Sequence, residues 1–600
     1  MNFIKDLNIE KFHFFIGVSL VLLMISPLLY IGEQAIIGDG NILLQRLEAM
    51  RQSIVLYHQW PGLNIWNAGG QPLDGHAGIF PLSIKGILVL FLGTQLGLNI
   101  TIIVYVICGY IGSWLLASIF WKNSLIRNVF ALLLIVNLPL LFHLSAGHII
   151  FYVYYLLPLI LYYLIQSPVD KWSGIKAGIL FGLAFNDTPA YLLQYLSIVL
   201  VAVYIGLIFN VDTSKRKMMY RGLILFIFSL LPIIAYHAIT IYQNAIENPR
   251  ESNLIFHYFS SDIFKSYFYP FTKIEKAFSS PPGVPGMSCV RSTHEVAAYL
   301  GIIGFALVCI SLINGFKWWH YLILILFMAG LGNDSAFYPM YWLQKLPSFS
   351  SHLCFSRVRI ITHLFLPFAI TGGLWILWSK FKLKKYGRII VLVVGGVLIL
   401  ERLVIGFMII KDTHVNIEQA DPFYRSHYEY VARDNRFINV SVIPPFEATQ
   451  LNIGILRGGG DSNIPMNNKD ADGYAGPIGF DEEGYIAEFH QNGQKIESDY
   501  WSPNKIEFSR LDPKMPLILN MNLSSAWYNN GVQLFPDYKI VEVNKRFEVM
   551  PDKDGIILLT YEFPGRKIGM ATTVLFFILS IFVIGYFRRK DNRVNVNSTV

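Results

Sequence analysis

The chain has 600 residues, of which 54% are hydrophobic and only 15% are charged. Ordinary soluble domains carry about 25% charged residues, so the composition argues against a soluble protein and for one whose main solvent is lipid. The formal charge of +8 does not indicate a nucleic-acid partner. The basic residues lie in short clusters between apolar segments, where membrane topology accounts for them.

Apolar segments of spanning length recur along the whole chain. Residues 13–31 and 569–587, for example, are almost free of charge over the roughly 20 residues that a transmembrane helix needs. We predict about 12 such helices, near 13–31, 99–120, 128–146, 150–167, 174–188, 190–209, 222–240, 295–314, 318–333, 361–378, 388–409 and 569–587. The segment 81–97 is also apolar, and its sequence leaves open whether it spans the bilayer or re-enters it.

The basic clusters predict the orientation of these helices. If the chain starts in the cytoplasm and 81–97 does not span, every short basic loop falls on one side, as the positive-inside rule requires. Both termini are then cytoplasmic. Four large segments then lie on the outer side of the membrane, namely 32–80, 241–294, 334–360 and 410–566.

The last of these segments has the pattern of a β-rich domain. Short strand-like runs alternate with clusters of Gly, Pro, Asn and Asp, at Phe437–Ile443, Lys505–Ser509, Pro516–Asn520 and Gly555–Tyr561. The predicted fold is therefore a polytopic α-helical membrane protein with a C-terminal extracytoplasmic β-sandwich-like domain. We divide it into a transmembrane domain 1–409 with its first outer loop at 32–80, the β-rich domain 410–566, and a final helix with a basic tail 567–600.

The first outer loop opens with Gly38-Asp39-Gly40. A helix lying in the plane of the membrane interface is predicted to follow, because one helical face collects the apolar residues at 43, 44, 47 and 50. Asp39 could act as a general base toward a sugar hydroxyl, and the flanking glycines would let a substrate approach closely. The same Asp39 could instead cap the helix, since Asp is a preferred N-cap residue.

Further polar groups lie at span ends on the same predicted side of the membrane. Any single one could be an interfacial anchor. Together with the first outer loop, however, five separate connections bring acid, imidazole and guanidinium groups to that side. The four further connections contribute His148, Asp187, Arg291 with Glu295, and Arg357 with Arg359. A guanidinium forms paired hydrogen bonds to phosphate oxygens, so Arg357 and Arg359 suit phosphate recognition. The four cysteines show no metal-ligand spacing, and a disulfide between Cys289 and Cys354 cannot be deduced.

Several short motifs resemble the YfhO-like bacterial membrane proteins of the GT-C superfamily of membrane glycosyltransferases. They are Gly38-Asp39, Trp66-Asn67 with Gly69-Gly70-Gln71-Pro72, Gly147-His148, Asn248-Pro249-Arg250, Glu295–Gly301, Leu346-Pro347 with Arg357 and Arg359, and the run around Ala526-Trp527-Tyr528 that leads to Leu559–Phe563. The sequence departs from that family at Ser525-Ala526-Trp527, where Pro-Gly-Trp is usual.

This resemblance implies a transferase of hexosyl or pentosyl groups in the bacterial cytoplasmic (inner) membrane, with its active site outside. Asp39 would be the catalytic base, and the donor would be a polyprenyl-phosphate sugar. The acceptor would be a glycan or lipid of the cell envelope. Trp66 and Asn67 would join His148, Asp187, Arg291, Glu295, Arg357 and Arg359 as substrate-binding residues.

Two other functions fit the sequence. One is a transporter or flippase for lipid-linked saccharides, and the other is a non-catalytic envelope scaffold. A transporter would place ionisable residues near the middle of broken helices, whereas here they cluster at span ends. No cofactor is expected, and a divalent metal would be compatible with the chemistry although no ligand pattern supports one. Membrane lipids are expected partners and nucleic acid is not. The sugar, the acceptor and the oligomeric state are left open.

Overall fold

The computed structural model describes residues 2–29, 34–36, 39–66, 70–76, 78–170, 172–187, 190–247, 260–270, 297–331, 357–381, 385–411, 414–416, 449, 468–469, 475–476, 489–519, 521, 524–536, 547–563 and 565–597. The chain forms two compact units. Unit 1 comprises 1–32, 99–230 and 252–415, and unit 2 comprises 33–98, 231–251 and 416–600. Segments of the two units alternate along the sequence. The domain boundary expected at residue 409 stays a prediction.

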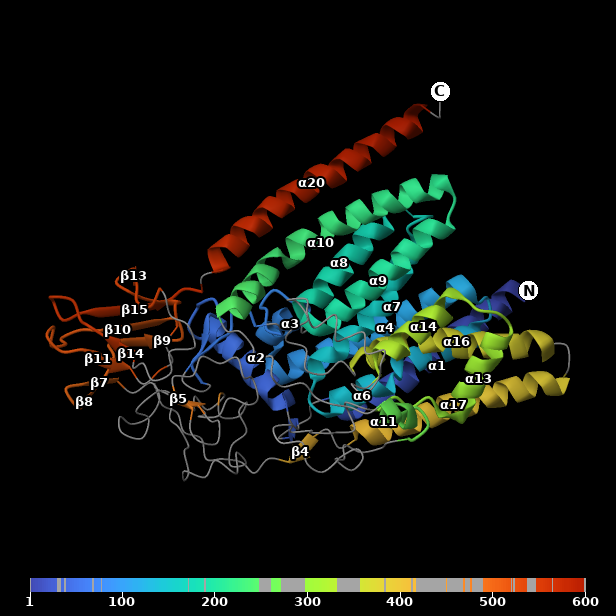
Figure 1. The fold of residues 1–600 in the computed structure, drawn as a ribbon, viewed down its shortest axis with the longest axis horizontal. Helices are drawn as coiled ribbons and strands as arrows, with labels where there is room; N and C mark the ends of the chain where they lie inside the picture. The colour runs from blue at the N-terminus through green and yellow to red at the C-terminus, as the bar shows by residue number, and fades with distance from the viewer. Residues whose placement is uncertain are drawn as a thin grey trace. The chain divides into compact units, whose positions relative to one another are not determined.

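Unit 1 is built from helices (Figure 1). Two of them, α4 (Thr94–Phe120) and α10 (Thr213–Glu247), cross the boundary between the units. The others are α1 (Asn2–Ile25), η1 (Ser26–Leu28), α5 (Ser124–Ile135), α6 (Leu138–Ser145), η2 (Ile149–Leu156), α7 (Leu157–Gln166), α8 (Ser173–Asp187), α9 (Ala190–Asn210), α11 (Ser260–Ser266), α13 (Gly301–Ile313), α14 (Trp318–Ala329), α16 (Val358–Phe381) and α17 (Lys385–Ile410).

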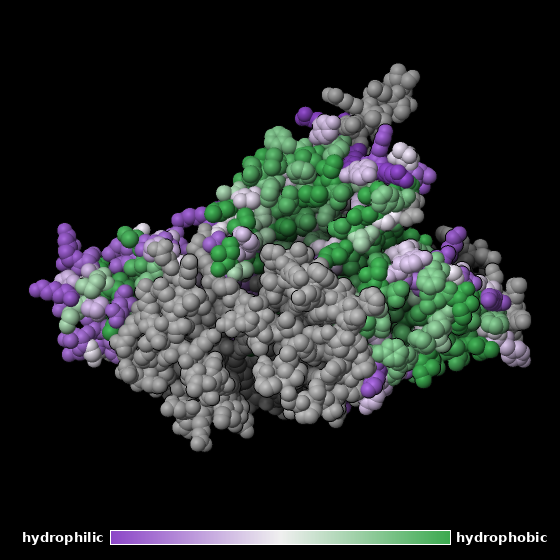
Figure 2. All heavy atoms as spheres, viewed as in Figure 1, coloured by the Kyte–Doolittle hydropathy of each residue, from purple (hydrophilic) through white to green (hydrophobic). Residues whose placement is uncertain are grey.

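Among the described residues, eight helices are long and apolar enough to cross a membrane, and three shorter apolar helices accompany them. They show a multi-pass helical membrane protein, with fewer full-length spans than the 12 or so predicted. The helix α8 has 15 residues and reaches about 22 Å, which is less than the roughly 30 Å hydrocarbon core of a bilayer. Figure 2 shows hydrophobic side chains over the visible helix surfaces and hydrophilic ones among the strands. Which side is cytoplasmic stays a prediction.

The helix α16 forms the centre of unit 1. It packs against α13, α14 and α5, and the window of this helix that could span the membrane is 78% buried. Gly373 allows the contact with α13, because a Cβ atom there would lie 2.1 Å from the carbonyl oxygen of Leu307. Small residues at such points let helix backbones approach closely in lipid.

Unit 2 begins with β1 (Gln34–Ile36), α2 (Asp39–Val55), β2 (Leu63–Asn64), β3 (Gln71–Pro72) and α3 (Ile84–Leu92). The apolar face predicted for α2 is present, but the polar Gln45, Glu48 and Gln52 are buried too. Other parts of unit 2 cover these polar side chains, for example at Thr94, whose hydroxyl donates to Glu48. That the helix lies in the plane of the membrane interface stays a prediction. The nine residues of α3 reach only about 14 Å and are too short to span a bilayer.

The C-terminal part of unit 2 contains the predicted β-rich segment, followed by α20 (Gly565–Asn597). One antiparallel sheet has the order β13-β12-β15-β10-β9 and the other β14-β11-β7-β8. The strands are β7 (Phe489–Gln491), β8 (Gln494–Ile496), β9 (Tyr500–Ser502), β10 (Lys505–Phe508), β11 (Leu517–Leu519), β12 (Trp527–Asn529), β13 (Val532–Gln533), β14 (Phe547–Val549) and β15 (Ile557–Tyr561). Short strands β4 (His414–Asn416), β5 (Asn468–Lys469) and β6 (Ala475–Gly476) lie between α17 and β7 in the sequence.

Alternating burial explains how the two sheets share a core. In β15, buried Ile557, Leu559 and Tyr561 alternate with less buried neighbours, as expected for a strand with one face inward. Rings from opposite sheets then meet, with centroids 4.9 Å apart for Phe489 and Phe508. Three of the predicted strand-like runs correspond to β10, β11 and β15, and the run Phe437–Ile443 lies outside the described residues.

Candidate functional site

A sharp turn after α6 brings two histidines of unit 1 together. Gly147 has a φ of +89°, which a residue with a side chain rarely adopts, and the amide of His148 then donates to the carbonyl oxygen of His143 at 2.9 Å. The Nδ1 atoms of the two imidazoles lie 2.9 Å apart. One nitrogen must donate and the other accept, so the two imidazoles are joined by a hydrogen bond.

Phe151 of η2 joins this histidine pair to Arg357. Its ring centroid lies 5.1 Å from that of His143 and 5.5 Å from that of His148. The guanidinium carbon of Arg357, just before α16, lies 5.9 Å from the same ring, a cation–π distance. Arg357 is only half-buried. A partly exposed guanidinium beside an imidazole pair is suited to binding an anion such as phosphate.

The next residue of η2, Tyr152, contacts a second polar group. Its ring packs edge-on against that of Tyr105 from α4, with centroids 4.8 Å apart. The hydroxyl of Tyr105 donates a hydrogen bond to Oδ2 of Asp187 at the end of α8. All three side chains are fully buried. Two consecutive residues of η2 therefore contact the two groups. Phe151 contacts His148 and Arg357, and Tyr152 packs against Tyr105, which donates to Asp187.

Arg359 lies in different surroundings from Arg357. It is 2% exposed, and its Cγ atom lies 3.3 Å from the position that a Cβ atom would take at Gly330. Its positive charge acts on the hydroxyl of Tyr267. The two arginines therefore have different neighbours: Arg357 lies over the ring of Phe151, and Arg359 lies beside Gly330.

The remaining predicted site residues fall in unit 2 or outside the described residues. The helix α2 begins at Asp39, whose side chain is not among those described. Trp66 is fully buried, and its amide donates to Oδ1 of Asn64, so it belongs to the core of unit 2. Asn67, Arg291 and Glu295 lie outside the described residues, as do Cys289 and Cys354.

Unit 2 has a buried polar cluster around Asp74. Its Oδ2 accepts a hydrogen bond of 2.7 Å from the hydroxyl of Tyr236 in α10, and the guanidinium carbon of Arg566 lies 5.8 Å from the neighbouring Trp60 ring. Burial raises the pKa of Asp74 to about 6, although the Tyr236 hydrogen bond and the charge of Arg566 act in the opposite direction. Such a carboxyl can hold or release a proton near neutral pH.

Sequence reasoning did not single out Tyr105, His143, Phe151 or Asp74 as site residues. His143 could have been found, because an ionisable residue inside an apolar span is by default a functional candidate. Tyr105 and Phe151 gave no such signal, since aromatic residues are common in apolar helices. Among the residues that the structure describes, no group of three His, Cys, Asp or Glu side chains could hold a metal ion.

Comparisons with known proteins found one distant structural similarity. No protein-family model matches the sequence, and no curated protein matches it. Among solved structures, the chain is similar to the arabinofuranosyltransferase AftD from Mycobacteria, with 10% sequence identity and a TM-score of 0.36. The similarity covers 67% of this chain and spans 26% of that transferase. A similarity this distant carries no argument about the activity of this chain.

Proposed function

We propose that this protein is a membrane glycosyltransferase that moves a sugar from a polyprenyl-phosphate-linked donor to a cell-envelope acceptor on the outer face of the membrane. The observation that carries the proposal is the meeting of Arg357 and the His143–His148 pair on Phe151. Next to it, η2 also supports the buried carboxylate of Asp187 through Tyr152 and Tyr105. Groups suited to binding phosphate and to accepting a proton are thus arranged around one segment, η2, of a multi-pass membrane protein.

The proposed reaction divides its roles among these residues. Arg357 and His148 bind the donor phosphate, and Arg359 adds positive charge in the first turn of α16. The acceptor oxygen forms a bond to the anomeric carbon while the bond from that carbon to the phosphate oxygen breaks, which releases polyprenyl phosphate. A base takes the hydroxyl proton of the acceptor. We assign that role to Asp39, because the motif Gly38-Asp39 resembles the acidic motif of the YfhO-like GT-C proteins.

Substrate contacts beyond the phosphate follow from the same resemblance. Asp187 is proposed to hold a sugar hydroxyl, with Tyr105 fixing the carboxylate. Trp66, Asn67, Arg291 and Glu295 are retained as proposed substrate-binding residues. The β-rich segment 410–566 is proposed to be an extracytoplasmic sandwich that faces the acceptor glycan.

A transporter of lipid-linked saccharides would use ionisable groups inside spans. Arg402 in α17 is such a group, and it is 3% exposed. Its two terminal nitrogens donate to the carbonyl oxygens of Tyr299 and Leu300, each at 2.5 Å. These hydrogen bonds hold the backbone before α13 against α17. Arg402 therefore has a structural role in unit 1 and is no evidence for a transporter.

The phosphate-binding role can be tested with a matched pair of arginine variants. Arg357→Lys keeps the positive charge but loses the planar fork, so we expect the KM for a polyprenyl-phosphate sugar to rise about tenfold or more. Arg216→Lys is the control, since Arg216 also stands near a span end and donates to the carbonyl oxygen of Val211. The measurement is sugar transfer by purified protein in liposomes. Equal KM values for wild type and Arg357→Lys would make Arg357 an ordinary interfacial anchor.

A further inference from the structure

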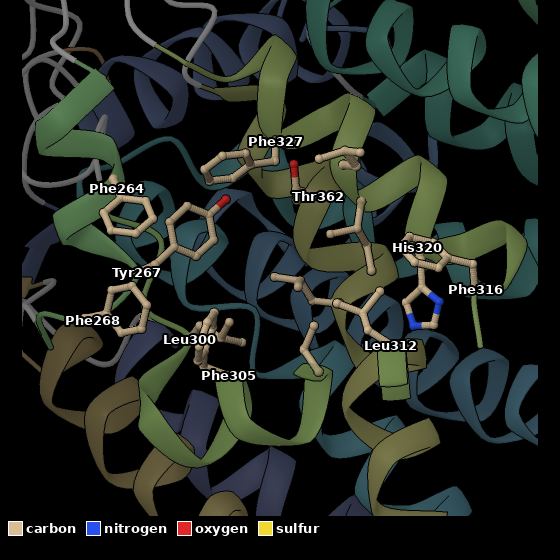
Figure 3. A pocket seen from close by; sticks show the side chains of 14 residues that line it. Phe264, Tyr267, Phe268, Leu300, Phe305, Leu312, Phe316, His320, Phe327 and Thr362 are labelled. Carbon is tan, nitrogen blue, oxygen red and sulfur yellow. The ribbon is translucent and has the colours of Figure 1, made fainter. Parts of the chain in front are cut away.

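Unit 1 contains an apolar cavity of about 310 Å³ between α11, α13, α14 and α16. Figure 3 shows Phe264, Tyr267 and Phe268 gathered at one end and Phe316 and His320 at the other. Leu300 and Leu312 both line it, and Leu312 follows Leu300 by 12 positions, which corresponds to about 18 Å of helix. The cavity therefore extends over more than half of the roughly 30 Å hydrocarbon core of a bilayer.

The wall of the cavity suits a hydrocarbon chain. Two of its polar residues have their hydrogen-bonding atoms engaged elsewhere: Thr362 donates to the carbonyl oxygen of Val358 at 3.3 Å, and Nε2 of His320 lies 3.1 Å from the hydroxyl of Ser311. Phe264, Phe305 and Leu324 line the cavity while being 45–56% exposed. A lipid chain could therefore enter sideways from the bilayer.

One end of the cavity has a polar group that is available to a ligand. Tyr267 is 6% exposed, and its hydroxyl has no hydrogen-bond partner among the residues that the structure describes. Figure 3 shows this hydroxyl pointing toward Phe327 and Thr362. Burial raises the pKa of Tyr267 to about 12, with the positive charge of Arg359 acting in the opposite direction, so the phenol keeps its proton at neutral pH. A buried donor without a partner is unfavourable, and a bound acceptor would satisfy it.

We infer that the cavity holds the isoprenoid chain of a polyprenyl phosphate, with the phosphate at the Tyr267 end. The Tyr267 hydroxyl donates to a phosphate oxygen, and Arg359 supplies the complementary positive charge. Arg357 stands at the same end of α16 as Arg359. The cavity proposed to hold the lipid chain, called the chain site below, therefore adjoins the same helix end as the proposed transfer site. The choice of an isoprenoid rests on the proposed function.

The chain site can be tested by filling the cavity. Ile323→Trp places a larger side chain in its wall, whereas Ile325→Trp is the matched control, because Ile325 lies on the same helix, is 61% exposed and does not line the cavity. The probe is undecaprenyl phosphate, and its retention by the full-length protein is measured by native mass spectrometry. We expect Ile323→Trp to weaken retention about tenfold and Ile325→Trp to leave it unchanged. Equal effects of the two variants would overturn the inference.

The headgroup end is tested with Tyr267→Phe, which removes the donor but keeps the ring. This variant should lose about tenfold in affinity for undecaprenyl phosphate and none for undecaprenol. Tyr321→Phe, at an exposed position of α14, is the control. If dioleoylphosphatidic acid binds as tightly as undecaprenyl phosphate, the site accepts acidic lipids in general and the isoprenoid assignment is wrong.

These assays measure binding and involve no sugar. If the lining variants weaken retention while the wild type transfers no sugar, the chain site stands and the proposed function fails. If the wild type transfers sugar while Ile323→Trp retains lipid normally, the proposed function stands and the chain site fails.

Discussion

Asp74 is buried in unit 2 with a raised pKa of about 6, mainly because burial disfavours its charged form. A group whose pKa is higher in the folded than in the unfolded protein binds more protons when folded. Its contribution to stability is therefore fully present below pH 4 and is lost as the pH rises through about 6. The shift of about two units corresponds to roughly 3 kcal/mol.

This effect predicts the behaviour of Asp74→Asn. The amide can still accept the Tyr236 hydrogen bond but cannot ionise, so the variant should gain stability relative to the wild type, by up to roughly 3 kcal/mol, between pH 4 and pH 7. The measurement is the thermal unfolding midpoint in detergent across that range. The exposed Asp499 provides the control variant Asp499→Asn. Parallel pH profiles for wild type and Asp74→Asn would show that Asp74 does not titrate there.

At the residue scale, the sequence was enough to identify ionisable residues at the ends of apolar segments, because their side chains can bind phosphate or take a proton. His148, Asp187 and Arg357 were singled out, and the structure places His148 and Arg357 on one aromatic ring. The partners that orient them were not predictable. Tyr105 lies 82 residues before Asp187 in the chain, and only tertiary packing brings the two together.

Among the structural elements, the contact between the loop before β2 and the turn between β9 and β10 links the β-rich part of unit 2 to its helical part. Nδ2 of Asn504 donates to the carbonyl oxygen of Trp60 at 2.5 Å, and Oδ1 accepts from the amide of Leu63 at 3.2 Å. The side chain of Gln59 contacts the Ser502 hydroxyl and the Asn504 amide. One asparagine therefore satisfies two backbone groups of the segment between α2 and β3.

Asn504→Ala removes both of these hydrogen bonds. Two backbone groups would lose their partners, at a cost of about 1–3 kcal/mol each, so the loop should open locally more often. Hydrogen–deuterium exchange of the peptide containing Leu63 should accelerate roughly tenfold or more. Gln494→Ala, at an exposed strand position, should leave this exchange unchanged. Unaltered protection in Asn504→Ala would mean that other contacts hold the loop.

An element could be predicted from the sequence where its pattern of apolar and polar residues matches which of its side chains are buried. The strand β10 was expected from its alternation, and its buried Ile506 and Phe508 follow that pattern. The helix α2 was expected from its apolar face, but the burial of Glu48 was not. Its Oε2 accepts a hydrogen bond of 2.5 Å from the hydroxyl of Thr94, a residue 46 positions away. A polar face covered by a distant segment leaves no local signature.

For the molecule as a whole, composition alone indicated a multi-pass membrane protein, and the helices confirm that class. The positive-inside rule supplied an orientation, which stays a prediction. Sequence did not anticipate two units that interleave along the chain, because such a division depends on contacts between distant segments. Within unit 2, for example, Tyr236 lies 162 residues from the Asp74 carboxylate to which it donates.

The central claim is that the protein transfers a sugar from a lipid phosphate with Asp39 as the base. The most direct measurement follows a radiolabelled sugar from polyprenyl phosphate to envelope acceptor in liposomes containing purified protein, either wild type or Asp39→Asn. Asparagine keeps the size and capping ability of Asp39 but cannot take a proton, and a positioned base contributes about 10²–10⁴-fold in rate. We predict transfer by the wild type and a loss of at least about a hundredfold in Asp39→Asn, with donor binding intact. Absence of transfer by the wild type, or equal rates for the two proteins, would contradict this claim.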